Sequence, residues 1–322
     1  MTVRLDVLTV GRVGVDLYPE QHGSLADVRT FAKSLGGTAT NVAVGAARLG
    51  RRAAVLTKVG PDGFGAYVRK ALAGFGVDTS YVGTAAHLLT PVVFCELDPP
   101  EDPPLLFYRL PTAPDLTLEP ADVPWDVVEQ VPLLWVTGTG ASVEPARSTQ
   151  LDMLTRRGRP AAGSGRHTVL DLDWRPMFWP TPDDARVQYA RMLEHVTVIV
   201  GNRAEVAVAV GTDDPEEAAR RLLARGVELA LVKKGAEGVL VATANGVSTV
   251  PAHVVTVVNG LGAGDAFGAA VVDGLLAGLE PAVIAERGNA AGAIVASRLA
   301  CADAMPTRHE LEDLVHQRRA PA

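Results

Sequence analysis

Short apolar runs and amphipathic helical patterns follow one another along nearly the whole chain, and this alternation limits the folds open to it. The apolar runs carry too few polar residues for one face to meet water, so they predict strands buried on both sides. These runs lie at residues 3–10, 53–59, 133–137, 168–173, 196–200, 229–233 and 238–242. Helical patterns lie at residues 41–49, 64–75, 145–156, 183–194, 202–210, 215–225, 265–277 and 281–297. This order predicts an α/β fold with a mostly parallel central sheet and helices on both faces.

Two stretches depart from this alternation. Residues 16–35 contain no convincing helix, and residues 90–112 contain two strand-like runs joined by the proline-rich turn DPPEDPP. Because Pro favours turns and interrupts regular elements, both stretches predict β excursions from the α/β core. We interpret them as a small β lid over a site, with ordinary surface hairpins as the alternative. In this interpretation residues 1–322 form a single domain.

Composition argues against several classes of protein. The net charge of −7 opposes a nucleic-acid partner, because phosphate backbones attract basic surfaces. No run of about 18 uncharged apolar residues occurs, and the N-terminal run carries Arg4 and Asp6, so we predict neither a membrane span nor a signal peptide. Cys95 and Cys301 lie far apart without a CxxC pair, which favours two reduced thiols over a disulfide. We therefore expect a cytoplasmic protein.

The strongest local motif is the glycine-rich sequence NGLGAGD at residues 259–265, which leads directly into a predicted helix. Successive amides of Gly262, Ala263 and Gly264 at a helix start would form an anion site that the helix dipole strengthens. Asp265 beside that site would be the base that removes a proton from a hydroxyl attacking a phosphoryl group. The alternative is a glycine-rich helix start with a capping Asp. Neither a dinucleotide fingerprint nor a Walker A sequence fits.

A glycine pair, Gly36 and Gly37, opens the helical pattern that contains Asn41. Small residues allow a polar ligand to lie against main-chain amides, and an Asn side chain can both donate hydrogen bonds to sugar hydroxyls and accept them. The motif therefore indicates a sugar site, with a tight turn near a helix cap as the alternative.

Two further segments each have a structural and a functional interpretation. Asn202 followed three residues later by Glu205 is a variant of the capping box. Lys233, Gly235 and Gly238 lie in a loop between two predicted strands, where they would approach nucleotide phosphates. A plain hairpin turn is the alternative for this loop.

Together with Asp16 after the first strand, these motifs occur in an order that resembles the ribokinase-like (PfkB) carbohydrate kinases, and the resemblance covers essentially the whole chain. It implies a three-layer α/β fold with a β lid, ATP and Mg²⁺ as cofactors, and phosphoryl transfer to a small-molecule sugar. It assigns sugar contacts to Asp16, Gly36, Gly37 and Asn41, nucleotide contacts to Asn202, Lys233, Gly235, Gly238 and Asn289, magnesium-bound water to Glu205, and the phosphoryl anion hole with its base to Gly262, Ala263, Gly264 and Asp265. Relatives often pair through lid strands, so the resemblance also implies a homodimer.

One pair of residues departs from the family pattern. Many relatives have Asp-Thr where this chain has Asn259-Gly260, and in them that Asp helps to hold a monovalent cation. A neutral Asn weakens such a site, which makes a monovalent cation doubtful here.

Three segments indicate which sugar is bound. Residues 11–19, 90–96 and 107–115 resemble the 5-dehydro-2-deoxygluconokinases of inositol breakdown, and the sequence DLDWRP at residues 171–176 resembles sugar-acid and fructose kinases. The resemblance implies ATP-dependent phosphorylation of the 6-hydroxyl of a sugar acid, 5-dehydro-2-deoxy-D-gluconate. The alternatives are 2-keto-3-deoxygluconate, fructose or a nucleoside as acceptor, and more distantly a non-catalytic sensor of sugar acid or nucleotide.

A sugar acid carries a carboxylate, which an Arg side chain binds through two parallel hydrogen bonds. Arg109 in the expected lid and Arg175 after a predicted strand are the candidates, with Arg12 as a weaker third. A surface or structural ion pair is the alternative for each.

Overall fold

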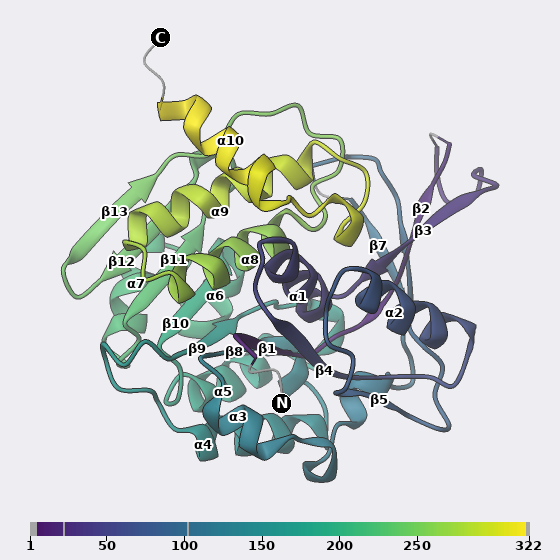
Figure 1. Cartoon of the computed structure of the whole chain (residues 1–322), viewed down its shortest axis with the longest axis horizontal. Helices are drawn as coiled ribbons and strands as arrows, with labels where there is room; N and C mark the ends of the chain where they lie inside the picture. The colour runs from purple at the N-terminus through teal and green to yellow at the C-terminus, as the bar shows by residue number, and fades with distance from the viewer. Residues whose placement is uncertain (1–4, 22, 102, 320–322) are drawn as a thin grey trace.

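A nine-stranded sheet forms the centre of the molecule (Figure 1). The structure is a computed structural model, and it describes residues 5–21, 23–101 and 103–319. In spatial order its strands are β13 (Gly246–Val250), β12 (Val239–Thr243), β11 (Leu229–Lys233), β10 (Val198–Asn202), β9 (His167–Asp171), β8 (Leu133–Thr137), β1 (Val7–Val10), β4 (Ala53–Val59) and β5 (Val82–Thr84). All neighbours from β5 to β11 pair in parallel, and β12 and β13 are antiparallel. The predicted mostly parallel sheet is confirmed.

Helices cover both faces of this sheet, as the sequence predicts. Successive residues of a strand point to opposite faces, so Val7 and Leu8 of β1 belong to two different cores. One face carries α1 (Thr38–Arg48), α2 (Gly63–Gly74), α8 (Ala263–Leu276), α9 (Pro281–Ala296) and α10 (Arg308–Arg319). The other carries α3 (Trp125–Gln130), α4 (Ala146–Arg157), α5 (Pro182–Met192), α6 (Arg203–Val210) and α7 (Pro215–Leu223).

Four elements were not predicted: β5, β13, α3 and α10. The last helix that the sequence predicts, at residues 281–297, is not the last in the structure, because α10 follows α9. α10 is mostly charged, with Leu311 and Val315 as buried residues. β13 is an exposed edge strand of mixed composition, so it lacks an apolar run. The first strand begins at Val7, and residues 3 and 4 of its predicted range lie outside the described residues.

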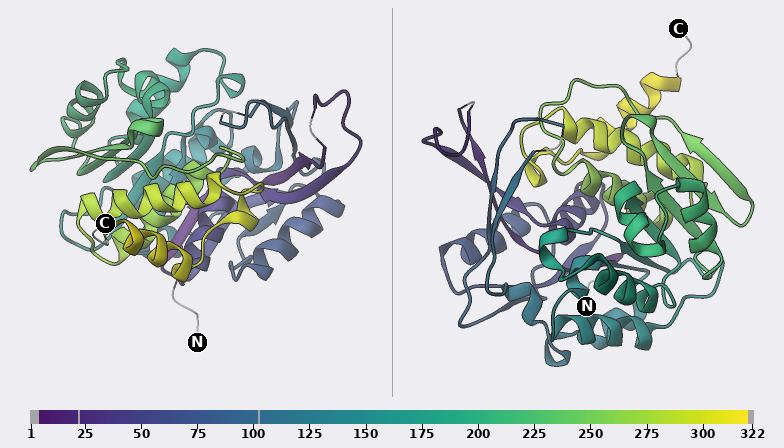
Figure 2. Two further views of the ribbon diagram at one scale, coloured as in Figure 1. Left: turned by 90° about the horizontal axis from the view of Figure 1, so that it is seen from above. Right: turned by 180° about the vertical axis from the view of Figure 1, so that it is seen from behind.

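A second sheet of four strands, in the order β3-β2-β6-β7, packs beside the first. It consists of β2 (Gly14–Pro19), β3 (Phe31–Gly36), β6 (Val92–Cys95) and β7 (Leu105–Tyr108), so it comes from the two stretches that interrupt the alternation. The β2–β3 hairpin projects from the body of the molecule (Figure 2). In the part of the chain that the structure describes, every helix is too short or too polar to cross a membrane.

The helix that follows the NGLGAGD sequence is held by a buried ion cluster around Asp273. This carboxylate is 1% exposed and pairs with Arg51 at 2.7 Å, Arg308 at 2.9 Å and Arg287 at 3.2 Å. The three arginines come from the loop after α1, from α10 and from α9, so one side chain of α8 joins four segments of the chain.

Replacement of Asp273 by Asn is expected to lower the free energy of unfolding by about 3 kcal/mol, the lower end for a broken buried ion pair. It removes the buried counter-charge of Arg51 and Arg308, whereas Arg287 keeps Glu312 at 2.9 Å. Urea denaturation measures the change. A matched control is Asp214→Ala, which removes only the N-cap of α7 and should cost about 1 kcal/mol. Equal losses in the two variants would contradict the role of the Asp273 cluster.

Candidate active site

A cavity of about 490 Å³ opens at the carboxyl ends of the parallel strands. Asp171, Asn202 and Lys233 end strands β9, β10 and β11 and line this cavity, and Arg12 lines it from the loop after β1. The second sheet and the starts of α1 and α8 complete its wall. Ligands of open parallel sheets bind beyond the carboxyl ends of the strands, so the cavity lies where this fold places an active site.

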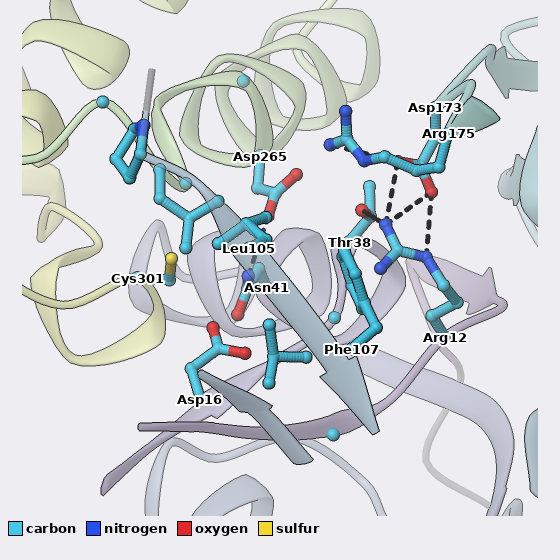
Figure 3. A pocket seen from close by; sticks show the side chains of 18 of the residues that line it. Arg12, Asp16, Thr38, Asn41, Leu105, Phe107, Asp173, Arg175, Asp265 and Cys301 are labelled. Carbon is cyan, nitrogen blue, oxygen red and sulfur yellow. Dashed lines mark hydrogen bonds and ion pairs between the residues drawn. The ribbon is translucent and has the colours of Figure 1, made fainter. Parts of the chain in front are cut away.

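Asp265 lies in the first turn of α8 and faces Asn41 of α1 (Figure 3). Asn41 Nδ2 donates to Asp265 Oδ2 at 2.7 Å, which joins the two glycine motifs. Burial raises the pKa of Asp265 to about 6, although the Asn41 hydrogen bond opposes the rise. The helix start requires Gly262, whose φ of 84° is left-handed. The arrangement places a buried carboxylate beside the start of α8, where the Ala263 amide donates to the Gly260 carbonyl at 3.4 Å.

Asp16 lines the cavity from strand β2 of the second sheet. Its Oδ2 accepts a hydrogen bond from the Tyr18 hydroxyl at 3.3 Å, and burial raises its pKa to about 7. A side chain at Gly36 would overlap this carboxylate, which explains the glycine there. Cys95 and Cys301 are buried around Tyr18 and both are free thiols, as the sequence predicts.

Arg12 forms a buried polar network on the opposite side of the cavity (Figure 3). Its guanidinium donates to both Asp173 carboxylate oxygens at 2.8 Å, to Thr38 at 2.7 Å and to Thr139 at 3.2 Å. Asp173 also has a φ of 34°, a conformation uncommon for residues other than Gly. Arg12 and Arg175 hold the pKa of Asp173 below its usual value against the effect of burial. The network therefore holds Arg12 and Asp173 as an ion pair.

The other two candidate arginines line the same cavity but differ in their pairing. Arg109 pairs with buried Asp115 at 2.9 Å, and its guanidinium carbon lies 4.8 Å from the centre of the Phe178 ring. Arg175 approaches Asp173 only to 3.4 Å, and within the described residues its buried Nε has no hydrogen-bond partner. Arg175 thus keeps an unpaired buried Nε, and Arg109 uses only its Nη2 in the hydrogen bonds of the described residues, so both arginines have donors left for a ligand.

The Asn202 segment both caps a helix and lines the cavity. Asn202 and Glu205 form a reciprocal capping box at the start of α6, with side-chain-to-backbone distances of 2.9 Å and 2.7 Å. Both residues also line the cavity, as do Lys233 and Gly235. The cap orients the Glu205 carboxylate, and capping and ligand binding are compatible here.

Four residues that the resemblance assigns to the site are not among those that line the cavity: Gly36, Gly238, Ala263 and Asn289. Gly36 lies behind Asp16, and Gly238 packs against the carbonyl of Val250. Asn289 donates to the carbonyls of Val250 and Pro251, so it ties α9 to the segment after β13. The remaining assigned residues, including Gly37 and Gly264, line the cavity.

The sequence patterns missed three side chains that line the cavity, Thr38, Phe107 and Asp173 as the partner of Arg12. They also missed Thr139, which does not line it but donates to Asp173 at 2.9 Å. Thr139 follows strand β8, so a polar residue just after a buried strand was the available signal. Phe107 lies on β7 and packs edge-on against Phe178, with 5.1 Å between the ring centres. No local sequence pattern predicts this contact.

The Asn259-Gly260 pair has specific contacts. Asn259 is fully buried; its Nδ2 donates to the Leu299 carbonyl and its Oδ1 accepts from the Leu261 amide at 3.0 Å. An Asp could not make the first of these hydrogen bonds while ionised. The Gly260 amide donates to the Pro100 carbonyl at 2.7 Å, so the β6–β7 turn reaches the glycine-rich loop.

Comparison with known proteins agrees with this geometry. Residues 4–308 match the model of the pfkB family of carbohydrate kinases. The chain is 33% identical to 5-dehydro-2-deoxygluconokinase of Geobacillus kaustophilus, over 98% of this chain and 95% of that protein. It is 34% identical to the enzyme of the same name from Photobacterium profundum, over 98% and 96%.

Solved structures show the same fold. A PfkB protein from Polaromonas sp. JS666 superposes with a TM-score of 0.82 at 29% identity, covering 96% of this chain and 99% of that one. Aminoimidazole riboside kinase from Salmonella enterica, solved with its riboside and an ATP analogue, superposes with a TM-score of 0.78 at 25% identity and the same coverage. The chain belongs to the pfkB family, and it is a carbohydrate kinase with the ribokinase-like fold.

Gly36→Ala is expected to raise the KM for the carbohydrate acceptor at least about tenfold, because the new methyl group displaces the Asp16 carboxylate and removes a hydrogen bond to a charged group. The KM for the nucleotide should change little. Steady-state kinetics with each substrate varied in turn measures both constants. Gly63→Ala is the matched control, since no atom lies within 4 Å of the added carbon. An equal rise in the acceptor KM in both variants would refute the clash between residue 36 and Asp16 as its cause.

Proposed function

We propose that the protein transfers the γ-phosphoryl group of ATP to the 6-hydroxyl of 5-dehydro-2-deoxy-D-gluconate. The observation that carries the proposal is the placement of Asp265, at the start of α8, in one cavity with Arg175, an arginine that has an unpaired donor. The first feature suits phosphoryl transfer to a hydroxyl and the second suits an acidic acceptor. Relatives of that name along almost the whole chain support the same acceptor.

The chemistry follows from the arrangement of the chain's own groups. The acceptor hydroxyl loses its proton to Asp265 while its oxygen bonds to the γ-phosphorus, and the bond to the β–γ bridging oxygen breaks to leave ADP. Amides of Gly262 and Gly264, which line the cavity, would donate to the transferred group at the positive end of α8. The Ala263 amide would join them only by giving up its 3.4 Å hydrogen bond to the Gly260 carbonyl. Asp16 and Asn41 would hold acceptor hydroxyls, and the second sheet would act as a lid that excludes water.

The cavity also suits a magnesium ion bound mainly by phosphate and water. Within the described residues there is no cluster of three or more His, Cys, Asp or Glu side chains placed to hold a metal. Mg²⁺ in phosphoryl-transfer sites needs only one or two carboxylates, and buried Glu205 and Asp171 both line this cavity. Glu205 would hold the ion through water, and the bound ion would neutralise phosphate charge.

The three arginines suggest how an acid is distinguished from a neutral sugar. Arg12 is already committed to Asp173, and Arg109 is paired with Asp115. Arg175 would therefore contact the acceptor carboxylate, with Arg109 beside it on the second sheet. An uncharged acceptor would lack the charge-assisted hydrogen bonds that a carboxylate accepts from Arg175, so it would bind with less favourable free energy.

A substrate panel tests the acceptor. We expect high kcat/KM for 5-dehydro-2-deoxygluconate and at least about tenfold lower values for 2-keto-3-deoxygluconate, fructose and nucleosides. Arg175→Met should remove most of the preference over fructose and nucleosides, which lack the carboxylate, by raising the acceptor KM. Arg52→Met, which alters an exposed pair with Asp6, should not. Equal kcat/KM values of the unaltered enzyme for sugar acids and neutral sugars would contradict the assignment of a sugar acid as acceptor.

Asp265→Asn should reduce kcat by about 10²-fold or more, the usual contribution of a general base, while ATP still binds. Because the pKa of Asp265 is raised to about 6, kcat/KM of the unaltered enzyme should fall as the pH drops through about 6, where the carboxylate becomes protonated. A pH–rate profile and nucleotide titration measure the two effects. Asp213→Asn, at an exposed position, is the control; near-normal turnover of Asp265→Asn would rule out the base.

A further inference from the structure

Lys233 places a positive charge beside the glycine-rich loop. It is the last residue of β11, pairs in register with Asn202 of β10, and lines the cavity. Its Nζ lies 3.2 Å from the point that a Cβ on Gly264 would occupy. The ammonium group therefore approaches the start of α8 through space that the absent side chain of Gly264 leaves open.

The surroundings of Lys233 keep this group charged. Glu205, Asp171 and Asp265 raise the pKa of Lys233 above its ordinary value, although burial acts against them. Among the described residues, however, no carboxylate oxygen comes within 4.0 Å of its Nζ to form an ion pair. A cation that reaches a cavity without a direct counter-ion is suited to bind an anionic ligand there.

We propose that Lys233 is a further catalytic residue, whose ammonium group contacts the phosphoryl group during its transfer from ATP to the acceptor. This inference rests on the proposed phosphoryl transfer. Helix-start amides would hold that group from one direction and Lys233 from the other, next to Gly264. The nitrogen remains protonated throughout: the hydroxyl proton goes to Asp265, and the electrons of the broken bond remain on ADP.

The position of the nitrogen distinguishes this role from a contact with the nucleotide alone. Gly264 directly precedes Asp265, so Lys233 Nζ lies at the loop that would hold the transferred group. Negative charge is spread over the transferred group and its leaving oxygen in the transition state, and a fixed cation at that place stabilises it. Loss of Lys233 should thus lower kcat more than it weakens ADP binding.

The test compares Lys233→Met, which keeps length and removes charge, with Lys70→Met, which changes an exposed lysine on α2. We expect Lys233→Met to lower kcat by about 10²–10³-fold, the usual loss for one charge-stabilising donor. The Kd of ADP should change less than about threefold, and the tight binding of ADP with aluminium fluoride and acceptor should be lost. Lys70→Met should match the unaltered enzyme in all three measurements.

Two results would overturn the proposal: an unchanged kcat, or an ADP Kd that rises as much as kcat falls, which would make Lys233 a nucleotide contact. If Lys233→Met does not fold, Lys233→Ala assayed with added methylamine or ethylamine replaces it. Amine-dependent recovery of kcat supports the proposal and its absence opposes it. The unaltered enzyme is assayed in parallel with the acceptor panel, so a wrong acceptor is detected separately from a wrong role for Lys233.

Discussion

The hydrogen bond from Asn41 to Asp265 is the contact on which the site depends. It spans 224 residues of sequence and joins the first turn of α8 to α1, two helices that pack on the same face of the central sheet. Without that packing neither glycine motif would face the other, and the carboxylate would lack its fixed direction. The Asp273 cluster supports the same helix from its other end, because three arginines from separate segments converge on it.

Burial gives the carboxylates of the cavity distinct properties. The pKa values of Asp16 and Asp265 rise to about 7 and about 6, because each loses water without gaining a directly paired cation. Asp173 behaves in the opposite way, since Arg12 and Arg175 compensate its burial. One cavity thus contains a carboxylate suited to accept a proton near neutral pH and another that stays ionised to hold an arginine in place.

The chain's apolar runs were sufficient to predict the central sheet, its parallel pairing and its two helical layers, because burial on both sides leaves a continuous apolar signal. The same reasoning failed for α10 and β13, whose side chains are mostly charged or exposed and carry no such signal. At the site, the glycine motifs predicted Asp265, Asn41 and the helix-start amides. They could not predict that Asn289 would bond to the carbonyls of Val250 and Pro251 instead of lining the cavity.

The sequence by itself determined the class of fold and the local chemistry: a carboxylate at a glycine-rich helix start, a capped α6, and arginines in plausible places. Only the tertiary structure decided how each arginine is paired, because that depends on Asp115 reaching Arg109 and on Asp173 reaching Arg12 more closely than Arg175. It also decided that Lys233 approaches Gly264, since the end of β11 and the start of α8 line the same cavity. Pairing and proximity are properties of the packed chain, and no local pattern encodes them.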